Sequence, residues 1–201
     1  MILVTSATRG DGKTLTCMNL AISLAADLNK RVLVIDSDMR RPTVHRLVRI
    51  SRLNGLSDIL QGNAELVDCA VNSKIPRLAV LPAGATPRNP LTLLTGDRFL
   101  KVIEYARANY DLVLIDSPPL LPVVDTRILR NMADMIVFVV RANATPPQAA
   151  VRSLQSMRDV TGVVFNYVSP GSFRRYYFYD AYSRYAYGDA QEEADEEATG
   201  D

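Results

Sequence analysis

The chain has few of the residues that build metal centres and covalent scaffolds, since its 201 residues include two cysteines and one histidine. Cys17 and Cys69 lie far apart, outside any Cys-x-x-Cys or Cys/His grouping. Their spacing disfavours a zinc site, an iron–sulfur site or a disulfide framework, and it favours a reducing cytoplasm. His45, standing alone, gives no basis for a histidine kinase or a metal cluster.

Long apolar runs and an excess of one charge are also missing. No uninterrupted apolar stretch reaches the roughly 18 residues that suggest a membrane span, and no secretory pattern opens the chain. Basic and acidic residues nearly balance, for a net charge of +1. A balance of this kind gives no global field toward nucleic acid or an anionic membrane. We therefore predict a soluble chain without a nucleic-acid partner.

Short runs rich in Val, Ile and Leu recur along the chain and predict buried strands at Ile2–Val4, Val32–Ile35, Leu78–Leu81, Leu112–Ile115, Ile136–Val140 and Val163–Phe165. Between several of them lie stretches with helical periodicity, at Lys13–Leu28, Arg98–Ala108, Thr126–Met132 and Pro147–Val160. Strands that alternate with helices predict an α/β fold. We expect three layers, with a mostly parallel central sheet covered by helices on both faces.

The composition changes abruptly after Ser169, so we predict one globular domain over residues 1–169 and a tail. Residues 170–188 form a tyrosine-rich segment that contains Tyr176, Tyr177, Tyr179, Tyr182, Tyr185 and Tyr187. Residues 189–201 are acidic, which predicts a disordered terminus.

The strongest local motif is Ala7-Thr-Arg-Gly10-Asp-Gly12-Lys13-Thr14, which follows a predicted strand and precedes a predicted helix. This is the pattern of a Walker A phosphate-binding loop, or P-loop, with Ala at its first position. Small residues let backbone N–H groups turn toward phosphate oxygens at the positive end of a helix. The predicted nucleotide contacts are Thr8, Arg9, Gly10, Asp11, Gly12, Lys13, Thr14 and Leu15, and the predicted ligand is ATP with Mg²⁺.

Carboxylates follow two of the predicted strands, at Asp36 and Asp38 and at Asp116. Parallel strands open their ligand crevice at their carboxyl ends, so these acids are candidates for holding Mg²⁺ and for orienting an attacking hydroxyl. Arg40 and Arg41 follow closely. They fit stabilisation of phosphate charge, contact with a neighbouring subunit, or an ordinary solvated loop.

These motifs, together with Val34-Ile-Asp36-Ser-Asp38-Met-Arg40-Arg41-Pro42, Leu81-Pro-Ala-Gly84, Asn89-Pro90 and Asp111-Leu-Val-Leu-Ile-Asp116-Ser-Pro-Pro119, span nearly all of the predicted domain. The chain resembles the bacterial tyrosine kinases of capsule and exopolysaccharide synthesis, a branch of the deviant-Walker ATPases. A tyrosine-rich C-terminus is also characteristic of that family. The resemblance implies an ATP-dependent protein-tyrosine autokinase.

The resemblance also implies residue roles. Lys13 matches the phosphate-binding lysine, and the implied magnesium set is Thr14, Asp36 and Asp116. Asp36 and Asp38 match the two Walker A′ acids, with Asp36 the first choice for the acid nearest the acceptor hydroxyl. The six tail tyrosines match the phosphoacceptors. Asn166 is a candidate adenine contact, with a strand-end turn as the equally weighted alternative.

The partners implied by the resemblance are a neighbouring subunit in a ring, a membrane-spanning activator or polysaccharide co-polymerase, and a cognate tyrosine phosphatase. The implied location is the inner face of the plasma membrane. Related kinases carry a segment before the first strand with a Glu and two Arg at three-residue intervals. Here Met1 stands directly before the P-loop strand, so we expect a truncated N-terminus and weak self-association.

Two other functions compete with an autokinase. One is an ATP-driven switch of the division-placement or partition type, which usually carries an additional lysine early in the P-loop, where this chain has Thr8 and Arg9. The other is a nucleotide-binding module whose tyrosines make aromatic contacts. Phosphotyrosine formed in the presence of Mg-ATP distinguishes the autokinase from both.

Overall fold

The computed structural model describes residues 1–50, 54–121, 125–157 and 159–169. The chain divides into two units, Met1–Asn166 and Tyr167–Asp201. The six predicted phosphoacceptor tyrosines and the acidic terminus lie outside the described residues. The fold described below is therefore that of the first unit.

A seven-stranded sheet forms the centre of this unit, in the order β3-β4-β2-β5-β1-β6-β7. Its strands are β1 (Ile2–Ser6), β2 (Val32–Asp36), β3 (Val71–Asn72), β4 (Leu78–Leu81), β5 (Leu112–Asp116), β6 (Met135–Arg141) and β7 (Gly162–Asn166). Every neighbouring pair is parallel except β3 and β4. All six predicted strands are present. The sequence analysis missed β3, because two exposed residues at a sheet edge carry no apolar run.

The helices of the described residues are α1 (Lys13–Ala26), α2 (Val44–Leu47), α3 (Leu56–Gln61), α4 (Leu66–Cys69), α5 (Pro90–Leu94), α6 (Asp97–Asn109), α7 (Asp125–Arg130) and α8 (Pro147–Ser156). Within the described residues, none of them combines the length and apolar character needed to cross a bilayer. The four predicted helices are confirmed. Three of them end earlier than predicted, at Ala26, Arg130 and Ser156, because sequence periodicity locates helix ends only to within a few residues.

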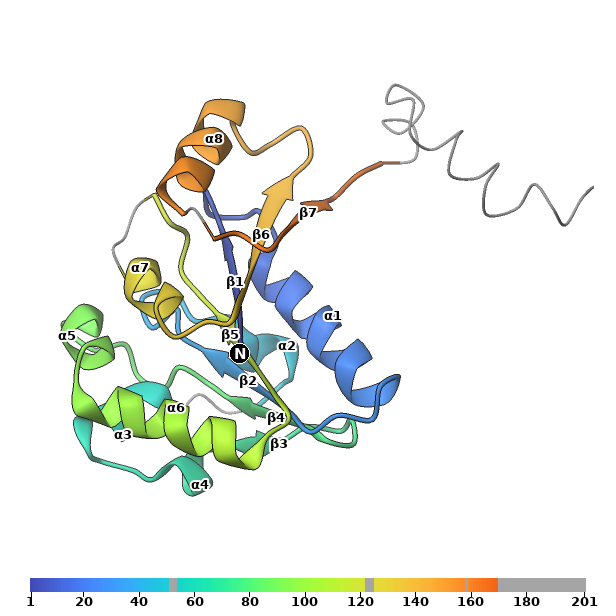
Figure 1. The fold of residues 1–201 in the computed structure, drawn as a ribbon. Helices are drawn as coiled ribbons and strands as arrows, with labels where there is room; N and C mark the ends of the chain where they lie inside the picture. Colours follow the sequence, from blue (N-terminus) through green and yellow to red (C-terminus); the bar gives the residue numbers. More distant parts are fainter. Residues whose placement is uncertain (51–53, 122–124, 158, 170–201) are drawn as a thin grey trace, which may run out of the picture. The chain divides into compact units, whose positions relative to one another are not determined.

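Two separate groups of buried apolar side chains cover the two faces of the sheet. One includes Cys17, Met18 and Ala21 from α1, and the other includes Phe99 and Val102 from α6. Figure 1 shows α1 on one side of the strands and α3, α6 and α7 on the other. The predicted three-layer α/β fold is confirmed.

The sheet brings Asp36 and Asp116 together at the carboxyl ends of two neighbouring strands. β2 and β5 are adjacent and parallel, and Asp36 is the register partner of Asp116. β1 lies between β5 and β6, so the chain turns to opposite sides of β1 as it continues to β2 and to β6. A crevice forms outside the carboxyl ends of the strands at such a reversal. The loop that leaves β1 begins at this point.

Candidate nucleotide-binding site

The loop between β1 and α1 contains two glycines in a left-handed backbone conformation. Gly10 has φ 85° and Gly12 has φ 95°, a region that favours glycine. A Cβ at Gly10 would meet nothing within 4 Å, so conformation rather than space requires glycine there. α1 begins at Lys13, and within this fully described helix no side chain caps the start and no acid occupies the first turn. Its first N–H groups are therefore available to an anion.

Asp11 braces this loop from within. Its carboxylate accepts hydrogen bonds from the N–H of Thr8, at 2.9 Å, and from the hydroxyl of Thr145, at 2.7 Å. The Asn166 side-chain amide donates to the Asp11 carbonyl, at 3.1 Å. The Asp11 side chain is thus engaged by protein groups, and Asn166 lies beside the phosphate loop. The adenine contact of Asn166 stays a prediction.

Asp116 lies where a magnesium ligand is expected. The hydroxyl of Thr14 donates to Asp116 Oδ2 at 2.7 Å and is 3.1 Å from the hydroxyl of Thr43. The other carboxylate oxygen, Oδ1, is buried and has no hydrogen-bond partner in the described part of the chain. A buried charged oxygen without a partner is costly. Asp116 therefore retains an unused acceptor next to a second oxygen ligand.

Asp36 is held differently, because backbone groups occupy its carboxylate. Oδ2 accepts from the N–H groups of Thr43, at 3.2 Å, and Val44, at 3.1 Å, while Oδ1 accepts from the N–H of Asp38, at 3.2 Å. Asp36 thereby fixes the turn that leads from β2 to α2. Asp38 is only partly buried and accepts from the N–H of Arg41 at 3.1 Å. Of the two Walker A′ acids, Asp38 is the more accessible.

Burial shifts the ionisation of both central acids. It raises the pKa of Asp36 to about 8, and the neighbouring Asp116 charge adds to the rise. It raises the pKa of Asp116 to about 7, although the Thr14 hydrogen bond and the Lys13 charge oppose the rise. When the pKa values of two neighbouring carboxyl groups are both raised, their surroundings supply too little positive charge to stabilise the ionised forms. The site is therefore electrostatically suited to a divalent cation.

The donor set also indicates which cation. The described residues hold no group of three or more His, Cys, Asp or Glu arranged as a metal site. Mg²⁺ commonly binds through one or two protein oxygens together with phosphate oxygens and water. The unpartnered Asp116 oxygen and the Thr14 hydroxyl fit this mode. The two residues form a partial shell that a nucleotide would complete.

The other predicted nucleotide contacts lie on the phosphate loop or on the first turn of α1. Lys13 is buried, at 7% exposure, and its charge acts on both Asp38 and Asp116. Leu15 is 41% exposed on the first turn of α1. Arg141, which the sequence analysis missed, places its guanidinium 3.3 Å from the carbonyl of Gly10. Its position on β6 carried no motif that would have identified it.

Four arginines line a cavity of about 240 Å³ at the rim of this site, together with Pro42 and Thr43. They are Arg9, Arg40, Arg41 and Arg46. The guanidinium of Arg40 pairs with the buried carboxylate of Asp125 on α7, at 2.9 Å. The side chains of the other three make no ion pair within the described part of the chain. The lining of the cavity contains no acid.

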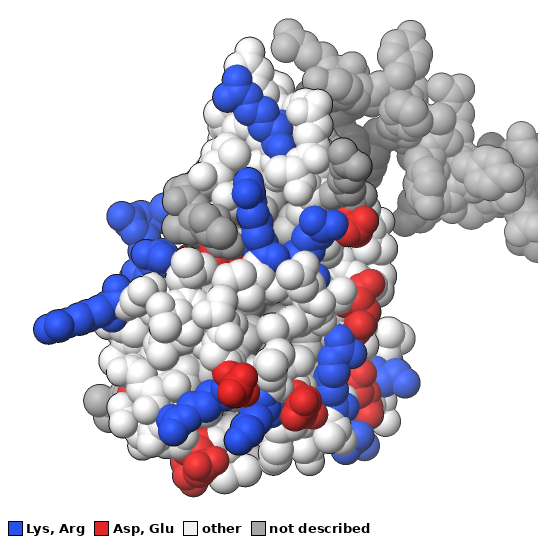
Figure 2. All heavy atoms as spheres, turned by 60° about the vertical axis from the view of Figure 1, so that its left-hand side comes forward, with Lys and Arg blue, Asp and Glu red and all other residues white. Residues whose placement is uncertain are grey.

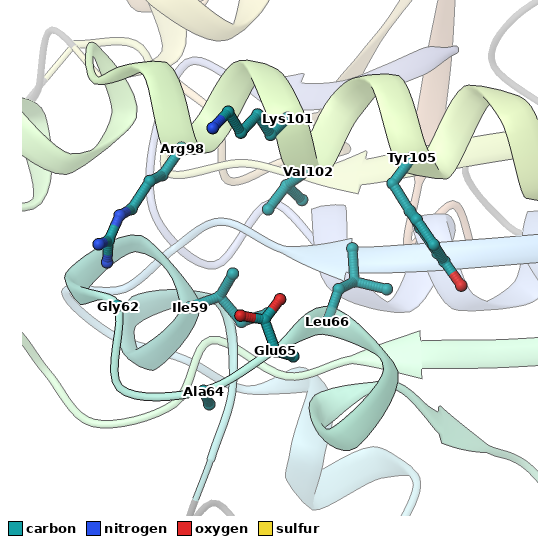
Figure 3. Close-up of a pocket in the computed structure, with 9 residues that line it drawn as sticks. All are labelled: Ile59, Gly62, Ala64, Glu65, Leu66, Arg98, Lys101, Val102 and Tyr105. Carbon is teal, nitrogen blue, oxygen red and sulfur yellow. The ribbon is translucent and has the colours of Figure 1, made fainter.

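A second cavity, of about 430 Å³, lies away from the phosphate loop between α6 and the segment joining α3 to α4. Arg98, Lys101 and Tyr105 project from α6, and Glu65 projects from the facing segment (Figure 3). Mixed charge also marks the surface of this region. In Figure 2, basic and acidic side chains are interspersed over the lower half of the face shown, whereas basic side chains predominate over the upper half.

Comparison with known proteins places these features in context. A family model described as an AAA domain matches residues 1–161. The chain is 37% identical over 191 residues to the tyrosine-protein kinase wzc of Salmonella typhimurium, covering 93% of this chain and 26% of that protein. It is 33% identical over 174 residues to the tyrosine-protein kinase CpsD of Streptococcus agalactiae, covering 84% of this chain and 75% of that protein.

The kinase domain of VpsO superimposes with a TM-score of 0.79 at 31% identity, covering 84% of each chain. The chain spans about a quarter of the length of the curated relatives that head the comparison.

Proposed function

The chain belongs to the bacterial tyrosine-protein kinases, and on this premise we propose that it transfers the γ-phosphate of Mg-ATP to tyrosines of its own C-terminal segment. The observation that carries the proposal is the unpartnered, buried oxygen of Asp116 beside the Thr14 hydroxyl. It adjoins the uncapped start of α1. This combination suits a magnesium ion and a phosphate chain rather than an apolar ligand.

The phosphates would lie on the loop from Gly10 to Thr14, where backbone N–H groups and Lys13 face them. Thr14 and Asp116 would hold Mg²⁺, and Asp36 would support them from the neighbouring strand. The ion, when bound, neutralises charge that develops on the transferred phosphoryl group. The rest of the catalytic effect comes from alignment of the acceptor with the γ-phosphate.

The transfer forms a bond between the tyrosine oxygen and the γ-phosphorus, breaks the bond to the β-phosphate oxygen, and releases ADP. The phenolic proton passes to a carboxylate. Asp36 and Asp38 are both candidates for that carboxylate. The greater accessibility of Asp38 favours a direct contact with the acceptor, while Asp36 holds the turn through the N–H groups of Thr43 and Val44.

The acceptors in this proposal are Tyr176, Tyr177, Tyr179, Tyr182, Tyr185 and Tyr187, supplied by a neighbouring molecule. Self-association, a membrane-spanning activator or polysaccharide co-polymerase, and a tyrosine phosphatase complete the proposed system. Its site is the inner face of the plasma membrane, and its output is the control of exopolysaccharide or capsule synthesis and export. Phosphates next to the acidic terminus add repulsion, so phosphorylation weakens self-association.

Mass spectrometry of phosphatase-treated protein, before and after incubation with Mg-ATP, tests the proposal. We expect phosphate on the tail tyrosines of the parent chain. A variant with all six tyrosines replaced by Phe should lose most of the label while retaining ATP binding, because Phe keeps the ring and removes the acceptor oxygen. ATP hydrolysis without phosphotyrosine would refute the kinase and favour a nucleotide-driven switch. Label found mainly outside the tail would refute the acceptor assignment.

A further inference from the structure

The arginine-lined cavity beside the phosphate loop is the feature that the proposed phosphotransfer leaves unexplained. In that reaction, magnesium, the P-loop N–H groups and Lys13 would supply positive charge to the phosphates. Arg41 and Arg46 are exposed and lie beyond β2, on the turn into α2 and on α2 itself. An excess of guanidinium groups without acidic partners attracts an anion from outside the nucleotide.

We propose that this cavity is an acceptor-docking site, which binds the acidic C-terminal segment of a second copy of the chain and so selects tyrosines that precede acidic residues. The inference rests on the proposed tyrosine phosphotransfer. The segment concerned contains Glu192, Glu193, Asp195, Glu196 and Glu197. Its charge is complementary to the cavity, and guanidinium groups bind carboxylates through paired hydrogen bonds.

The cavity is close enough to the reaction centre to guide an acceptor. Thr43 lines it, and the Thr43 hydroxyl is 3.1 Å from the Thr14 hydroxyl that faces the magnesium position. Arg9, which also lines the cavity, directly precedes Gly10 of the phosphate loop. An acidic side chain bound in the cavity would therefore lie next to the phosphate loop, close to the position of the γ-phosphate.

The spacing of the tail bears on which tyrosine would react first. Tyr187 and Glu192 are five residues apart, and five extended residues span at most about 17 Å. The earlier tyrosines, from Tyr176 onward, need progressively longer segments to be ordered between the two sites, and each ordered residue costs conformational entropy. Docking of the acidic segment thus favours Tyr185 and Tyr187 over Tyr176 and Tyr177 as first acceptors.

The lining of the cavity suits a charged ligand rather than an apolar one. Apart from Pro42 and Thr43, every residue that lines the cavity is an arginine, so its lining offers guanidinium donors and only one apolar side chain. The second cavity, between α6 and the α3–α4 segment, does offer Ile59, Leu66 and Val102 (Figure 3). It also contains Glu65, which would repel an acidic segment. The second cavity therefore serves as the matched control.

The kinetic test separates donor and acceptor molecules of the full chain. The acceptor carries Lys13→Met and cannot transfer phosphate, and the donor carries Phe at all six tail tyrosines. Replacing the five acidic residues of the acceptor with Gln or Asn should raise its KM about tenfold, as expected for the loss of two or three exposed charge pairs. Arg41→Gln together with Arg46→Gln in the donor should raise KM to a similar extent.

Combining the donor and acceptor changes should add little to either alone, because each removes the same contacts. Arg98→Gln together with Lys101→Gln in the donor, at the second cavity, should leave KM for the acceptor unchanged. If the arginine variants lower kcat and leave KM unchanged, or if the neutralised tail reacts as well as the parent tail, the docking site is wrong.

A binding measurement keeps the docking site distinct from the kinase activity itself. Fluorescence anisotropy of a labelled peptide of residues 185–201 should report binding to the Lys13→Met chain, weaker at higher salt and weaker in the Arg41→Gln, Arg46→Gln background. If the parent chain forms no phosphotyrosine with Mg-ATP and the peptide still binds, the kinase is refuted and the acidic docking site is retained. Equal binding of the peptide with its acidic residues neutralised would overturn the docking site. Tighter binding of a phosphotyrosine peptide without acidic residues would overturn it as well.

Discussion

The two ends of the β2–β5 strand pair carry the same residue type in opposite circumstances. Before the strands, Arg31 and Asp111 form an exposed pair at 2.8 Å, and the Arg31 guanidinium lowers the pKa of Asp111 to about 2. At their carboxyl ends, Asp36 and Asp116 face each other in register, and burial raises the pKa of both. At the first end, the carboxylate of Asp111 has its counter-charge within the fold. The other leaves charge to be satisfied by a ligand, which is characteristic of functional sites.

The prediction with the largest expected effect compares the removal of one cationic side chain from each end of the strand pair. Lys13→Met should reduce phosphotyrosine formation by about a thousandfold or more, because a cation on the transferring phosphoryl group contributes on that scale. Met keeps much of the length of Lys. Arg31→Met should change the rate less than about twofold, since an exposed pair contributes little. Autophosphorylation rates measure both effects, and circular dichroism checks that the variants are folded. Normal activity in folded Lys13→Met protein would refute the role of Lys13.

Neutral replacements of the aspartates should change stability in opposite directions. Without metal at neutral pH, Asp116→Asn should raise Tm by a few degrees, at about 2–4 °C per kcal/mol, because it removes a carboxylate whose charge is disfavoured by burial more than Thr14 and Lys13 offset. The same variant should lose the Tm increase given by Mg-ADP. Asp111→Asn should lower Tm slightly. Thermal unfolding with EDTA and with Mg-ADP measures both effects. A lower Tm for metal-free Asp116→Asn would show that the charge is compensated within the fold.

The pH dependence of stability should separate the ends as well. Raised pKa values mean that the folded state binds protons more tightly at Asp36 and Asp116, so metal-free stability falls as pH rises from 3.8 toward about 8. The lowered pKa of Asp111 has the opposite sign: its contribution is present above 3.8 and is lost as pH falls toward about 2.

Urea denaturation across this range with EDTA should therefore show a maximum in the acidic region. Saturating Mg-ADP should remove the decline on the alkaline side. A metal-free stability that rises through neutral pH would contradict the raised pKa values.

The smallest expected effect concerns salt. Arg31→Ala should lower Tm slightly in dilute buffer and have almost no effect in roughly 1 M salt, where the Debye length is about 3 Å. Asp116→Asn should keep most of its effect at high salt, because buried charges are screened much less. Comparing the two variants at two salt concentrations measures the difference. Equal screening of both effects would mean that water reaches Asp116.

Sequence patterns were informative where the physics is local. Runs such as Val32–Ile35 predicted buried strands, and the small residues of the P-loop predicted a loop whose backbone N–H groups can turn toward phosphate. The meeting of Asp36 and Asp116 was predictable because parallel strands end at the same edge of a sheet. Even the boundary of α1 was predicted at Lys13 and missed by only two residues at its other end.

Contacts between distant residues were not predictable from pattern. Thr145 bonds to Asp11 across 134 positions, and Arg40 pairs with Asp125 across 85. Neither partner belongs to a motif that specifies the other. The use of the Asp36 carboxylate by the Thr43 and Val44 N–H groups depends on the path of a turn with no periodicity. The short strand β3 depends on an edge pairing with β4.

The brace that Asp11 supplies to the phosphate loop has a consequence for turnover. Its hydrogen bonds to Thr8 and Thr145, and the amide of Asn166 on its carbonyl, hold the loop in shape from protein groups alone. The conformational entropy of ordering that loop is lost during folding rather than at each encounter with nucleotide. In the proposed reaction, ATP would meet a loop that the fold has already shaped. We therefore expect that the proposed phosphate transfer needs no ordering of this loop when the nucleotide binds.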